Sequence, residues 1–338
     1  MKAMRLNAVK TLAIEDREVP EPGPGEVRIR VDACGLCGSD RHFFKGEVPT
    51  AIPITLGHEF AGIVDAVGSG VNRLKPGMLV TGDPNIVCGA CEMCRAGRPN
   101  LCENLSMIGI TRDGGFAQYL TMPETQGHEL PPDLPATHGA FCEPISCCIH
   151  AIDIARIQPG QSVVVLGGGV IGLIMLQLAR LAGAGTTVLS TRQAPRRAMA
   201  ETLGATATID AGGADPVAAL HDVLPKGADV VIESAGVAET VAQSPYMARR
   251  GGAVVLFGLM PKGEMVPMSP FDLLVDEIRL EAAFLNPDTH GRAAQVVRDR
   301  ALDLDSLITR TIPLDEMPRA LATPPAFGEI KTIALPAA

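Results

Sequence analysis

The sequence contains no tryptophan, and aromatic residues make up only 3% of its 338 positions. Hydrophobic residues as a whole reach 46%, so any hydrophobic core must be built mainly from Val, Leu, Ile, Ala and Met. The 36 glycines and 27 prolines point to many turns, as expected where part of a chain forms short strands joined by loops. The length fits two domains or one large domain.

Positive charge is also scarce, because 29 Lys and Arg residues face 38 Asp and Glu residues, a formal net charge of −9. A nucleic-acid surface needs a basic patch, and the arginine clusters at 192–197 and 249–250 are too small to form one. The longest apolar run, 163–176, is shorter than the ~18 residues of a membrane helix and is interrupted by glycines. The N-terminal segment has no signal-peptide core, so we expect a cytoplasmic protein that binds neither nucleic acid nor membranes.

The nine cysteines are better explained as metal ligands or buried thiols than as disulfides, since a reducing compartment is expected. Four of them form the pattern Cys88-x2-Cys91-x2-Cys94-x7-Cys102 within an irregular segment, residues 83–105. Four thiolates at this spacing can surround a zinc ion and leave no open position, so this zinc should be structural. An iron–sulfur cluster is the alternative, but the seven-residue gap fits its usual spacing poorly.

A second set of potential metal ligands is spread over the first 150 residues: Cys37, His58, Glu59 and Glu143. Taken singly, each is as easily a buried or a surface residue, and a lone cysteine is more often a small buried hydrophobe. The neighbouring residues favour a catalytic zinc. Ser39 offers a hydroxyl that can take a proton, Asp40 a carboxylate that can orient a ligand, and His42 an imidazole that can pass the proton on.

Two rhythms divide the chain. Up to about residue 150 it reads as β-rich, with apolar and polar residues alternating at 27–31. From 151 to 285, continuous apolar strands alternate with helical segments, which indicates a parallel sheet covered on both faces. The expected elements there are strands at 163–166, 187–189, 230–232 and 254–257 and helices at 170–181 and 196–203. Helices near 292–300 and 314–321 and a strand at 330–335 complete the chain.

The strand at 163–166 leads into a GxGxxG pattern at the start of a helix. Glycines in this place allow a tight turn and let a pyrophosphate approach the helix N-terminus closely. After an apolar strand and before a helix, the pattern is a strong indication of a dinucleotide site. The residues expected to bind the dinucleotide here are Gly167, Gly169, Val170, Ile171 and Gly172.

The end of the next expected strand, after Leu189, lacks the acidic residue that binds the ribose 2′-hydroxyl of NAD. Ser190 and Thr191 offer hydroxyls instead. Arg192, with Arg196 one helical turn away, offers guanidinium groups that suit a 2′-phosphate by charge and geometry. We therefore expect NADP(H) as the cofactor. If Arg192 faces water, NAD stays possible.

These motifs together resemble the zinc-dependent medium-chain dehydrogenase/reductase family, and most of all its polyol (sorbitol) and threonine dehydrogenase branch. The resemblance spans essentially the whole chain and rests on Cys37-Gly38-Ser39-Asp40-x-His42, Gly57-His58-Glu59, the four-cysteine segment, Glu143-Pro144 and the glycine motif, in the family's order. It implies an α/β protein with two domains. Residues 1–150 and 286–338 would form a GroES-like β-rich catalytic domain, and 151–285 a Rossmann domain with a doubly wound parallel sheet.

The resemblance also implies roles for the first set of ligands. Cys37, His58 and Glu143 match the positions that hold the catalytic zinc. Glu59 is similar to a carboxylate that binds or exchanges at the metal in some members. Cys142 stands beside Glu143 as an alternative ligand, but Glu-Pro is what the polyol branch carries at this place.

The implied activity is reversible hydride transfer between NADP(H) and a small alcohol, polyol or hydroxy amino acid. Ser39 and His42 match the family's proton relay, and Asp40 matches a residue that orients ligands from behind. Two zinc ions per chain and a homodimer or homotetramer are expected. The alternatives are a zinc- and NADPH-binding sensor or scaffold without turnover, and an NAD-dependent threonine- or sorbitol-type dehydrogenase. A zinc-independent quinone reductase is disfavoured because the metal ligands are intact.

Overall fold

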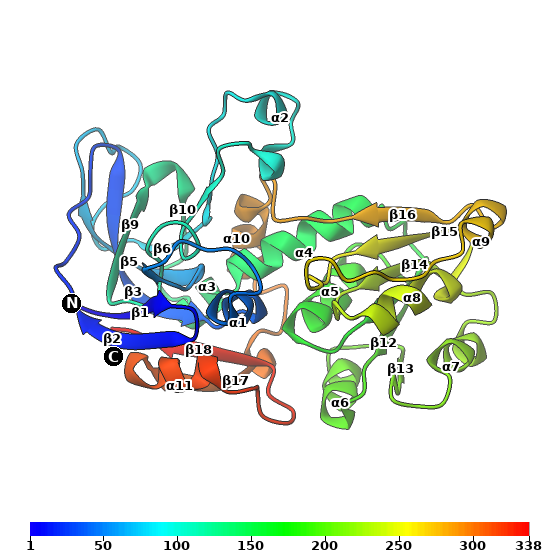
Figure 1. Cartoon of the computed structure of the whole chain (residues 1–338). Coiled ribbons are helices and arrows are strands. Elements are labelled where there is room, and N and C mark those ends of the chain that lie inside the picture. Colours follow the sequence, from blue (N-terminus) through cyan, green and yellow to red (C-terminus); the bar gives the residue numbers. More distant parts are fainter. Residues whose placement is uncertain (338) are drawn as a thin grey trace. The chain divides into compact units, whose positions relative to one another are not determined.

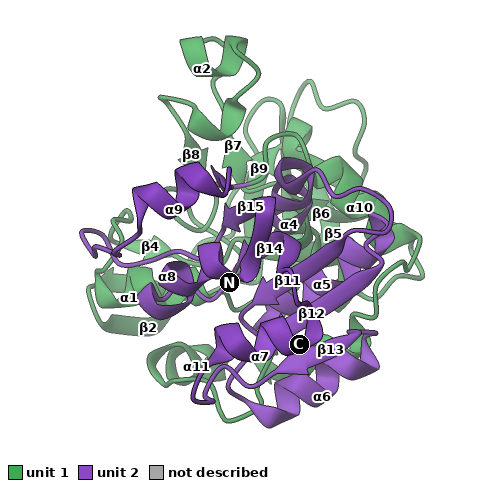
Figure 2. Cartoon of the chain, turned by 90° about the vertical axis from the view of Figure 1, so that its right-hand side faces the viewer, with its two compact units in different colours: residues 1–146, 286–338 green, residues 147–285 purple. Residues whose placement is uncertain are grey.

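The computed structural model describes residues 1–337, which form two compact units. Unit 1 contains Met1–Ser146 and the C-terminal segment that starts at Asn286, and unit 2 contains Cys147–Leu285 (Figure 2). Helix α4 (Cys142–Ala155) carries the chain from the first unit into the second.

Unit 1 is organised around a mixed seven-stranded sheet. Its strands follow the spatial order β10 (Gly127–Glu129), β6 (Leu79–Gly82), β5 (Glu59–Val67), β3 (Glu26–Gly35), β18 (Lys331–Leu335) and β17 (Ile308–Pro313), and β9 (Tyr119–Pro123) also pairs with β3. Val27, Ile29 and Val31 on β3 are fully buried, whereas Arg30 between them is exposed. The alternation predicted at 27–31 is therefore that of a half-buried strand.

The other elements of unit 1 are short. A three-stranded sheet has the order β2 (Thr11–Asp16), β1 (Lys2–Ala8), β4 (Ile54–Thr55), and β7 (Asn85–Ile86) pairs with β8 (Ser106–Met107). The α-helices are α1 (Gly38–Lys45), α2 (Glu92–Arg95), α3 (Ala136–Gly139), α10 (His290–Arg298) and α11 (Met317–Ala322). The 3-10 helices are η1 (Pro99–Leu101), η2 (Glu124–Gln126), η3 (Asp305–Leu307) and η4 (Leu314–Glu316).

Unit 2 is a six-stranded, all-parallel sheet (Figure 1). Its strands have the order β13 (Ala207–Ile209), β12 (Thr186–Ser190), β11 (Ser162–Leu166), β14 (Ala228–Glu233), β15 (Ala248–Leu256) and β16 (Arg279–Ala282). The helices are α5 (Val170–Leu181), α6 (Ala194–Thr202), α7 (Pro216–Val223), α8 (Ala238–Met247) and α9 (Pro270–Val275). The α/β class predicted from the alternating strands and helices is confirmed.

The strand order of unit 2 places its ligand site. Strands β12 and β13 lie on one side of β11, whereas the later strands β14, β15 and β16 lie on its other side, so the order of the strands switches between β11 and β14. In open α/β sheets, ligands bind outside the carboxyl ends of the strands at such a switch point. Here those ends are Leu166 and Glu233.

The hydrophobic cores are mainly aliphatic, as the scarcity of aromatic residues requires. Phe60, Phe116 and Phe141 are the largest fully buried side chains. The core of unit 2 includes Val164 and Val254. None of the described helices has the length and hydrophobicity that a membrane crossing requires.

Helix boundaries differ slightly from expectation near the C-terminus. The helix expected at 292–300 is α10, which begins and ends two residues earlier. Arg300 has a φ of +50°, a left-handed conformation that cannot continue an α-helix. The segment expected as a helix at 314–321 is divided into η4 and α11.

Candidate active site

Cys37, His58 and Glu59 come together in unit 1, with one donor atom of each within 4.8 Å of the others. Cys37 immediately precedes α1, and His58 immediately precedes β5, so two chain segments meet at this point. Gly57 makes the turn before His58 with a φ of +98°. A Cβ at this position would lie 2.8 Å from the backbone nitrogen of Phe116, so the close packing here requires glycine.

Asp40 is a fully buried carboxylate that lies behind two of these ligands. Its Oδ2 accepts a hydrogen bond of 2.9 Å from the backbone N–H of Cys37, and its Oδ1 lies 3.5 Å from Nδ1 of His58. Burial lowers the pKa of His58, but the charges of Asp40 and Cys37 outweigh it and leave that pKa well above its ordinary value. The same negative surroundings favour a bound cation. Thiolate, imidazole and carboxylate are donors that suit zinc.

Glu59 has a buried partner, Lys331, that sequence reasoning missed. The Nζ of Lys331 donates to Oε2 of Glu59 and, at 3.2 Å, to the carbonyl oxygen of Leu36. Both side chains of the ion pair are 1% exposed. Burial lowers the pKa of Lys331, but the charges of Glu59 and Cys37 raise it above its ordinary value. The ammonium group of Lys331 therefore lies beside the three candidate metal ligands.

The fourth predicted ligand, Glu143, lies in the first turn of α4 and is 8% exposed. It is outside the group that gathers within 4.8 Å, although its charge is one of those that raise the pKa of Lys331. Burial raises the pKa of the neighbouring Cys142 to about 12. A metal needs the thiolate, so this thiol is the poorer ligand of the two.

Both residues of the predicted proton relay lie on α1. The hydroxyl of Ser39 is 3.3 Å from Nε2 of His58, the ring nitrogen that does not face Asp40. His42 is farther from the metal ligands along the helix, where its Nδ1 lies 2.6 Å from Oε2 of Glu47. Its side chain is 30% exposed, so it can exchange protons with solvent.

The four cysteines of segment 83–105 also come together, with their sulfur atoms within 4.8 Å of one another. Backbone N–H groups within the loop point at these sulfurs, from Cys91 to Cys88 at 3.4 Å and from Cys94 to Cys91 at 3.5 Å. Hydrogen bonds from the backbone N–H groups of Ala90 and Cys91 lower the pKa of Cys88 to about 6. A thiolate at neutral pH is the form that binds zinc.

In unit 2, a cavity of about 260 Å³ opens at the carboxyl ends of the strands. The predicted dinucleotide residues that line it are Gly167, Gly169, Ser190, Thr191, Arg192 and Arg196. Gly167 has a φ of +111°, and a Cβ on Gly172 would lie 1.9 Å from the carbonyl oxygen of Gly167. Both glycines are therefore required for the turn from β11 into α5, whose first residues are Val170 and Ile171.

The arginines near this cavity have different environments. Arg197 donates to the carbonyl oxygen of Thr191 at 2.7 Å and pairs with Asp210 at 3.0 Å, so its charge is used within the protein. Arg192 and Arg196 line the cavity itself, as does the acidic Glu239 on α8. Sequence reasoning did not identify the lining residues Ser234, Ala235 and Thr240, which lie in or near the turn after β14.

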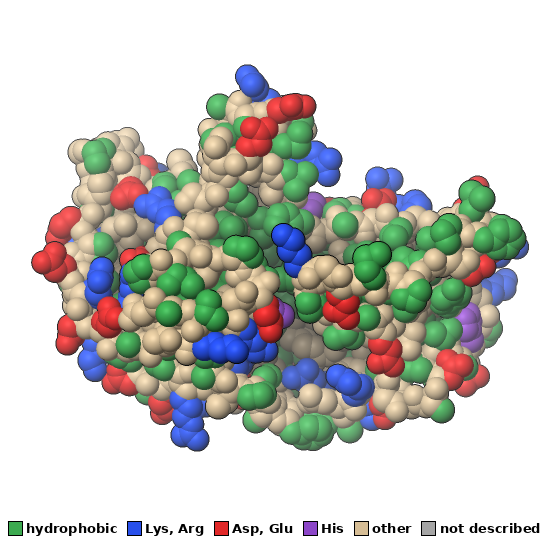
Figure 3. Space-filling model, viewed as in Figure 1, with side chains coloured by type: hydrophobic (Ala, Val, Ile, Leu, Met, Phe, Trp, Pro, Cys, Tyr) green, Lys and Arg blue, Asp and Glu red, His purple; other side chains and the backbone are tan. Residues whose placement is uncertain are grey.

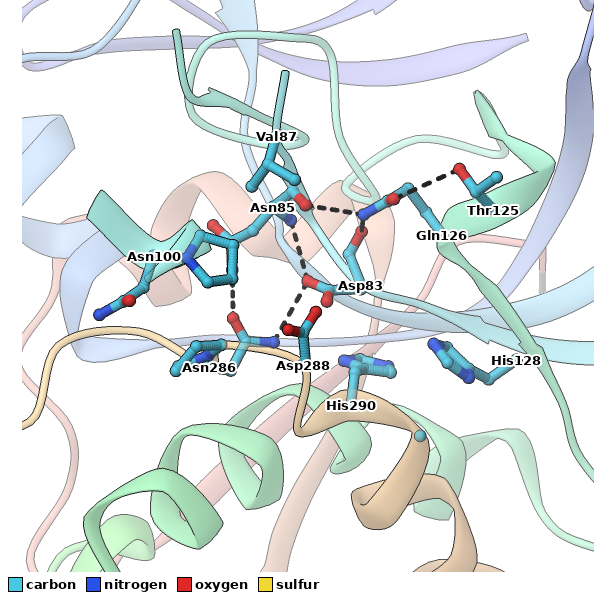
Figure 4. A pocket seen from close by; sticks show the side chains of 13 residues that line it. Asp83, Asn85, Val87, Asn100, Thr125, Gln126, His128, Asn286, Asp288 and His290 are labelled. Atoms are coloured by element: carbon cyan, nitrogen blue, oxygen red, sulfur yellow. Dashed lines mark hydrogen bonds between the residues drawn. The ribbon is translucent and has the colours of Figure 1, made fainter. Parts of the chain in front are cut away.

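Unit 1 contains a second polar cavity, of about 270 Å³, between the base of the four-cysteine segment and α10 (Figure 4). Asn286 donates to Oδ1 of Asp83 at 3.2 Å and accepts a hydrogen bond from Asn85. The rings of His128 and His290 lie 5.1 Å apart. Burial lowers the pKa of His128 to about 4 and that of His290 to about 3, so both are neutral at pH 7. These amide and carboxyl groups bond mainly to one another, which ties residues 83–85 to the start of the C-terminal segment.

Comparison with known proteins supports this description of both units. A family model described as alcohol dehydrogenase GroES-like domain matches residues 23–132, and one described as zinc-binding dehydrogenase matches residues 170–299. The chain is 32% identical to sorbitol dehydrogenase of Bacillus subtilis over 331 residues, covering 95% of this chain and 94% of that protein. It is 30% identical to D-arabinitol dehydrogenase 1 of Uromyces fabae over 325 residues, covering 95% and 93%.

A solved structure is similar over nearly the whole length. It is described as a zinc-binding dehydrogenase of Sinorhizobium meliloti bound to NADP, and it superposes with a TM-score of 0.97 at 50% identity, covering 99% of each chain. The predicted GroES-like and Rossmann architecture is thereby confirmed. The chain belongs to the zinc-dependent medium-chain dehydrogenase/reductase family, in its polyol dehydrogenase branch, and is an oxidoreductase of the alcohol and polyol dehydrogenase class.

Proposed function

We propose that this protein transfers a hydride between NADP(H) and a small alcohol or polyol, or the corresponding ketone, at a zinc site formed by Cys37, His58 and Glu143. The observation that carries the proposal is the gathering of the Cys37 thiol and the His58 imidazole, together with the Glu59 carboxylate, beside a buried Asp40, in a chain whose second unit has a dinucleotide cavity. Glu143 is assigned as the third ligand because Glu-Pro stands at this place in the polyol branch, and its charge acts on Lys331 in the same surroundings. Glu59 stays a further candidate ligand. Its bond to Lys331 neutralises its charge when it does not reach the metal.

In this proposal the chain's own residues orient the zinc ligands and move the substrate proton. A bound zinc ion supplies Lewis-acid polarisation of the substrate oxygen, and bound NADP accepts the hydride. Asp40 holds His58 so that Nε2 faces the ligand group. Ser39, 3.3 Å from that nitrogen, is placed to take the hydroxyl proton of the substrate, and His42 to exchange it with solvent. No hydrogen bond joins Ser39 to His42 within residues 1–337, so another group must connect them.

The preference for NADP rests on the cavity of unit 2. Arg192 and Arg196 lie on its wall against one acidic residue, Glu239, and no carboxylate follows Leu189 on β12. A guanidinium can bind a phosphate through two parallel hydrogen bonds. The similar Sinorhizobium meliloti structure was solved with NADP, which agrees with this preference.

A cofactor and substrate panel tests the proposal. Purified protein is assayed with NADP and with NAD on simple alcohols, sorbitol, xylitol and threonine, with reduction followed at the nicotinamide absorbance. Arg192→Ala is expected to raise the KM for NADP by about tenfold or more, because a charge-assisted hydrogen bond is worth about 1.5–3 kcal/mol, and to leave the KM for NAD nearly unchanged. Arg180→Ala is the control, since Arg180 bonds to the carbonyl of Gly204 away from the cavity. A clear preference of the wild type for NAD would refute the assignment.

We also propose that two copies of unit 2 associate through β16. This strand forms one edge of the parallel sheet, and an unpaired edge can add the same strand of a second copy. In the segment that precedes this strand in the chain, Met265, Phe271 and Leu274 are 88%, 71% and 77% exposed. Figure 3 shows hydrophobic side chains gathered over the part of unit 2 where α9 lies. An apolar patch next to an open edge is typical of a subunit interface.

The expected cytoplasmic location stays a prediction.

A further inference from the structure

The chain segment that follows β14 forms part of the wall of the dinucleotide cavity, opposite the glycine-rich loop. Ser234 donates to the carbonyl oxygen of Leu166 twice, from its backbone N–H at 2.9 Å and from its hydroxyl at 2.8 Å. A Cβ on Gly167 would lie 2.9 Å from the backbone nitrogen of Ala235, so the glycine loop and this turn are in direct contact. The positions of the turn and of the loop are therefore coupled.

One buried side chain holds this turn. Glu233, the last residue of β14, is fully buried, and its Oε1 accepts hydrogen bonds from the backbone N–H groups of Ala235 at 2.8 Å and Gly236 at 2.9 Å. The same oxygen accepts a hydrogen bond from the hydroxyl of Thr240 at 2.7 Å, in the first turns of α8. Three donors thus converge on one carboxylate oxygen. Two of them are backbone N–H groups of the turn itself, and within the protein Oε1 is the acceptor that both of them use.

The next strand holds the same residue from the other side. The carbonyl oxygen of Glu233 accepts hydrogen bonds from the backbone N–H groups of Phe257 at 2.9 Å and Gly258 at 3.0 Å. A Cβ on Gly258 would lie 2.2 Å from the backbone nitrogen of Gly236 and 2.7 Å from Oε2 of Glu233. The turn is therefore enclosed tightly by the carboxyl ends of β14 and β15, and a shorter side chain at 233 would leave its N–H groups unpaired.

We propose that Glu233 is a positioning residue for dinucleotide binding: its carboxylate fixes the turn 234–237, and through that turn the glycine-rich loop, in the conformation that receives the cofactor. It does not touch the cofactor itself, because it lies behind the cavity wall formed by Ser234, Ala235 and Thr240. The inference rests on the proposed binding of NADP(H) by unit 2.

The chain offers a matched control on the same strand. Asp229, near the opposite end of β14, accepts hydrogen bonds from the backbone N–H and hydroxyl of Ser162, each at 2.8 Å, and pairs with Arg249 at 2.7 Å. It is a carboxylate with a similar number of partners, but it lies at the amino end of the strand, away from the cavity. Asp229→Ala therefore reports what the loss of such a carboxylate does to unit 2 without loosening the turn.

The test measures NADPH binding to the zinc-loaded protein by the change in NADPH fluorescence, together with steady-state kinetics at varied NADP. Glu233→Ala is expected to raise the Kd for NADPH about tenfold or more. It should also raise the KM for NADP, while kcat at saturating NADP stays within about threefold of wild type. Glu233→Gln, which keeps an acceptor oxygen at Oε1, should restore the Kd to within about threefold. Asp229→Ala should leave the Kd unchanged even if it lowers the melting temperature.

The outcomes separate the two proposals. If the wild type binds no NADPH, the proposed function fails and this inference fails with it. If the wild type binds and Glu233→Ala binds equally well, or if Asp229→Ala weakens binding as much, the inference alone is overturned. Should Glu233→Ala not fold, Glu233→Asp serves in its place, because it keeps the charge but withdraws the oxygen from the turn. Its Kd for NADPH is then expected to be higher than those of the wild type and of Glu233→Gln, and a wild-type Kd would contradict the proposal.

Discussion

The buried ion pair between Glu59 and Lys331 provides the strongest quantitative prediction. Lys331→Met replaces the ammonium by a methyl group of similar length and leaves the carboxylate of Glu59 1% exposed with no cation beside it. Breaking a buried pair in this way costs about 3–5 kcal/mol, since the remaining carboxylate either stays charged without its lysine or must take up a proton. We expect the free energy of unfolding to fall by about that amount.

The double variant Glu59→Gln/Lys331→Met tests the cause. If the loss comes from an uncompensated buried charge, removing the second charge should recover at least about 2 kcal/mol. The exposed pair between Lys2 and Asp315, whose side chains are 50% and 60% exposed, is the control. Lys2→Met should change stability by no more than about 1 kcal/mol.

The measurement is urea-induced unfolding followed by far-UV circular dichroism, because the chain has no tryptophan and only two tyrosines to report by fluorescence. All variants are compared at one fixed zinc concentration and again with excess chelator, since a metal bound only to the folded state adds stability of its own. Lys331→Met behaving like Lys2→Met would refute the reasoning. So would a double variant as unstable as the single one.

Three further predictions test other parts of the molecule. Cys88→Ser should reduce the zinc content of the protein from two ions per chain to one and lower the melting temperature, as measured by elemental analysis and thermal unfolding. Cys147→Ser is the control outside the four-cysteine group and should keep both ions. An unchanged zinc content in Cys88→Ser would count against a structural zinc. Burial lowers the pKa of His290 to about 3, so between about pH 6.5 and pH 3 the unfolded chain binds a proton at this residue that the folded chain does not bind. The contribution to stability is complete above about pH 6.5 and is lost as the pH falls towards 3. His290→Gln should flatten the dependence of stability on pH in that range, and a slope identical to that of the wild type would argue against this prediction. Leu274→Asp should convert a dimer into monomers in light-scattering chromatography, whereas Phe327→Asp, equally exposed but in unit 1, should not, and a dimer that survives Leu274→Asp would exclude the β16 interface.

An element of the fold could be predicted where the residues within its own segment show a clear apolar pattern and clear turn signals. Strand β11 and helix α5 were predictable because a continuous apolar run, a glycine turn and a helical pattern follow one another without a gap. Strand β16 has no such run, since Arg279 and Glu281 alternate with apolar residues on an exposed sheet edge. Helix α8 was missed as well: it contains Pro245, which in sequence reads as a helix end.

The candidate site shows the same division between local and long-range information. Cys37 immediately precedes α1, and Ser39, Asp40 and His42 lie in its first two turns, so their cooperation is visible in their spacing. Lys331 is 272 positions away from Glu59 and reaches it only because β18 and β5 both pair with β3. No spacing rule could have connected the two residues.

Glu59 and Glu233 make this difference concrete, because both are buried carboxylates at one end of a strand. Glu59 needs a partner with a full charge and obtains it from the far end of the chain. Oε1 of Glu233 accepts hydrogen bonds from the N–H groups of its own next residues, Ala235 and Gly236, and the glycine that allows this turn stands in the same short segment. An acidic residue that ends an apolar strand and is followed within three positions by a glycine can therefore be interpreted from sequence as an acceptor for the backbone N–H groups of the turn that follows it. A carboxylate without such a turn, as at Glu59, implies a cation whose position only the fold reveals.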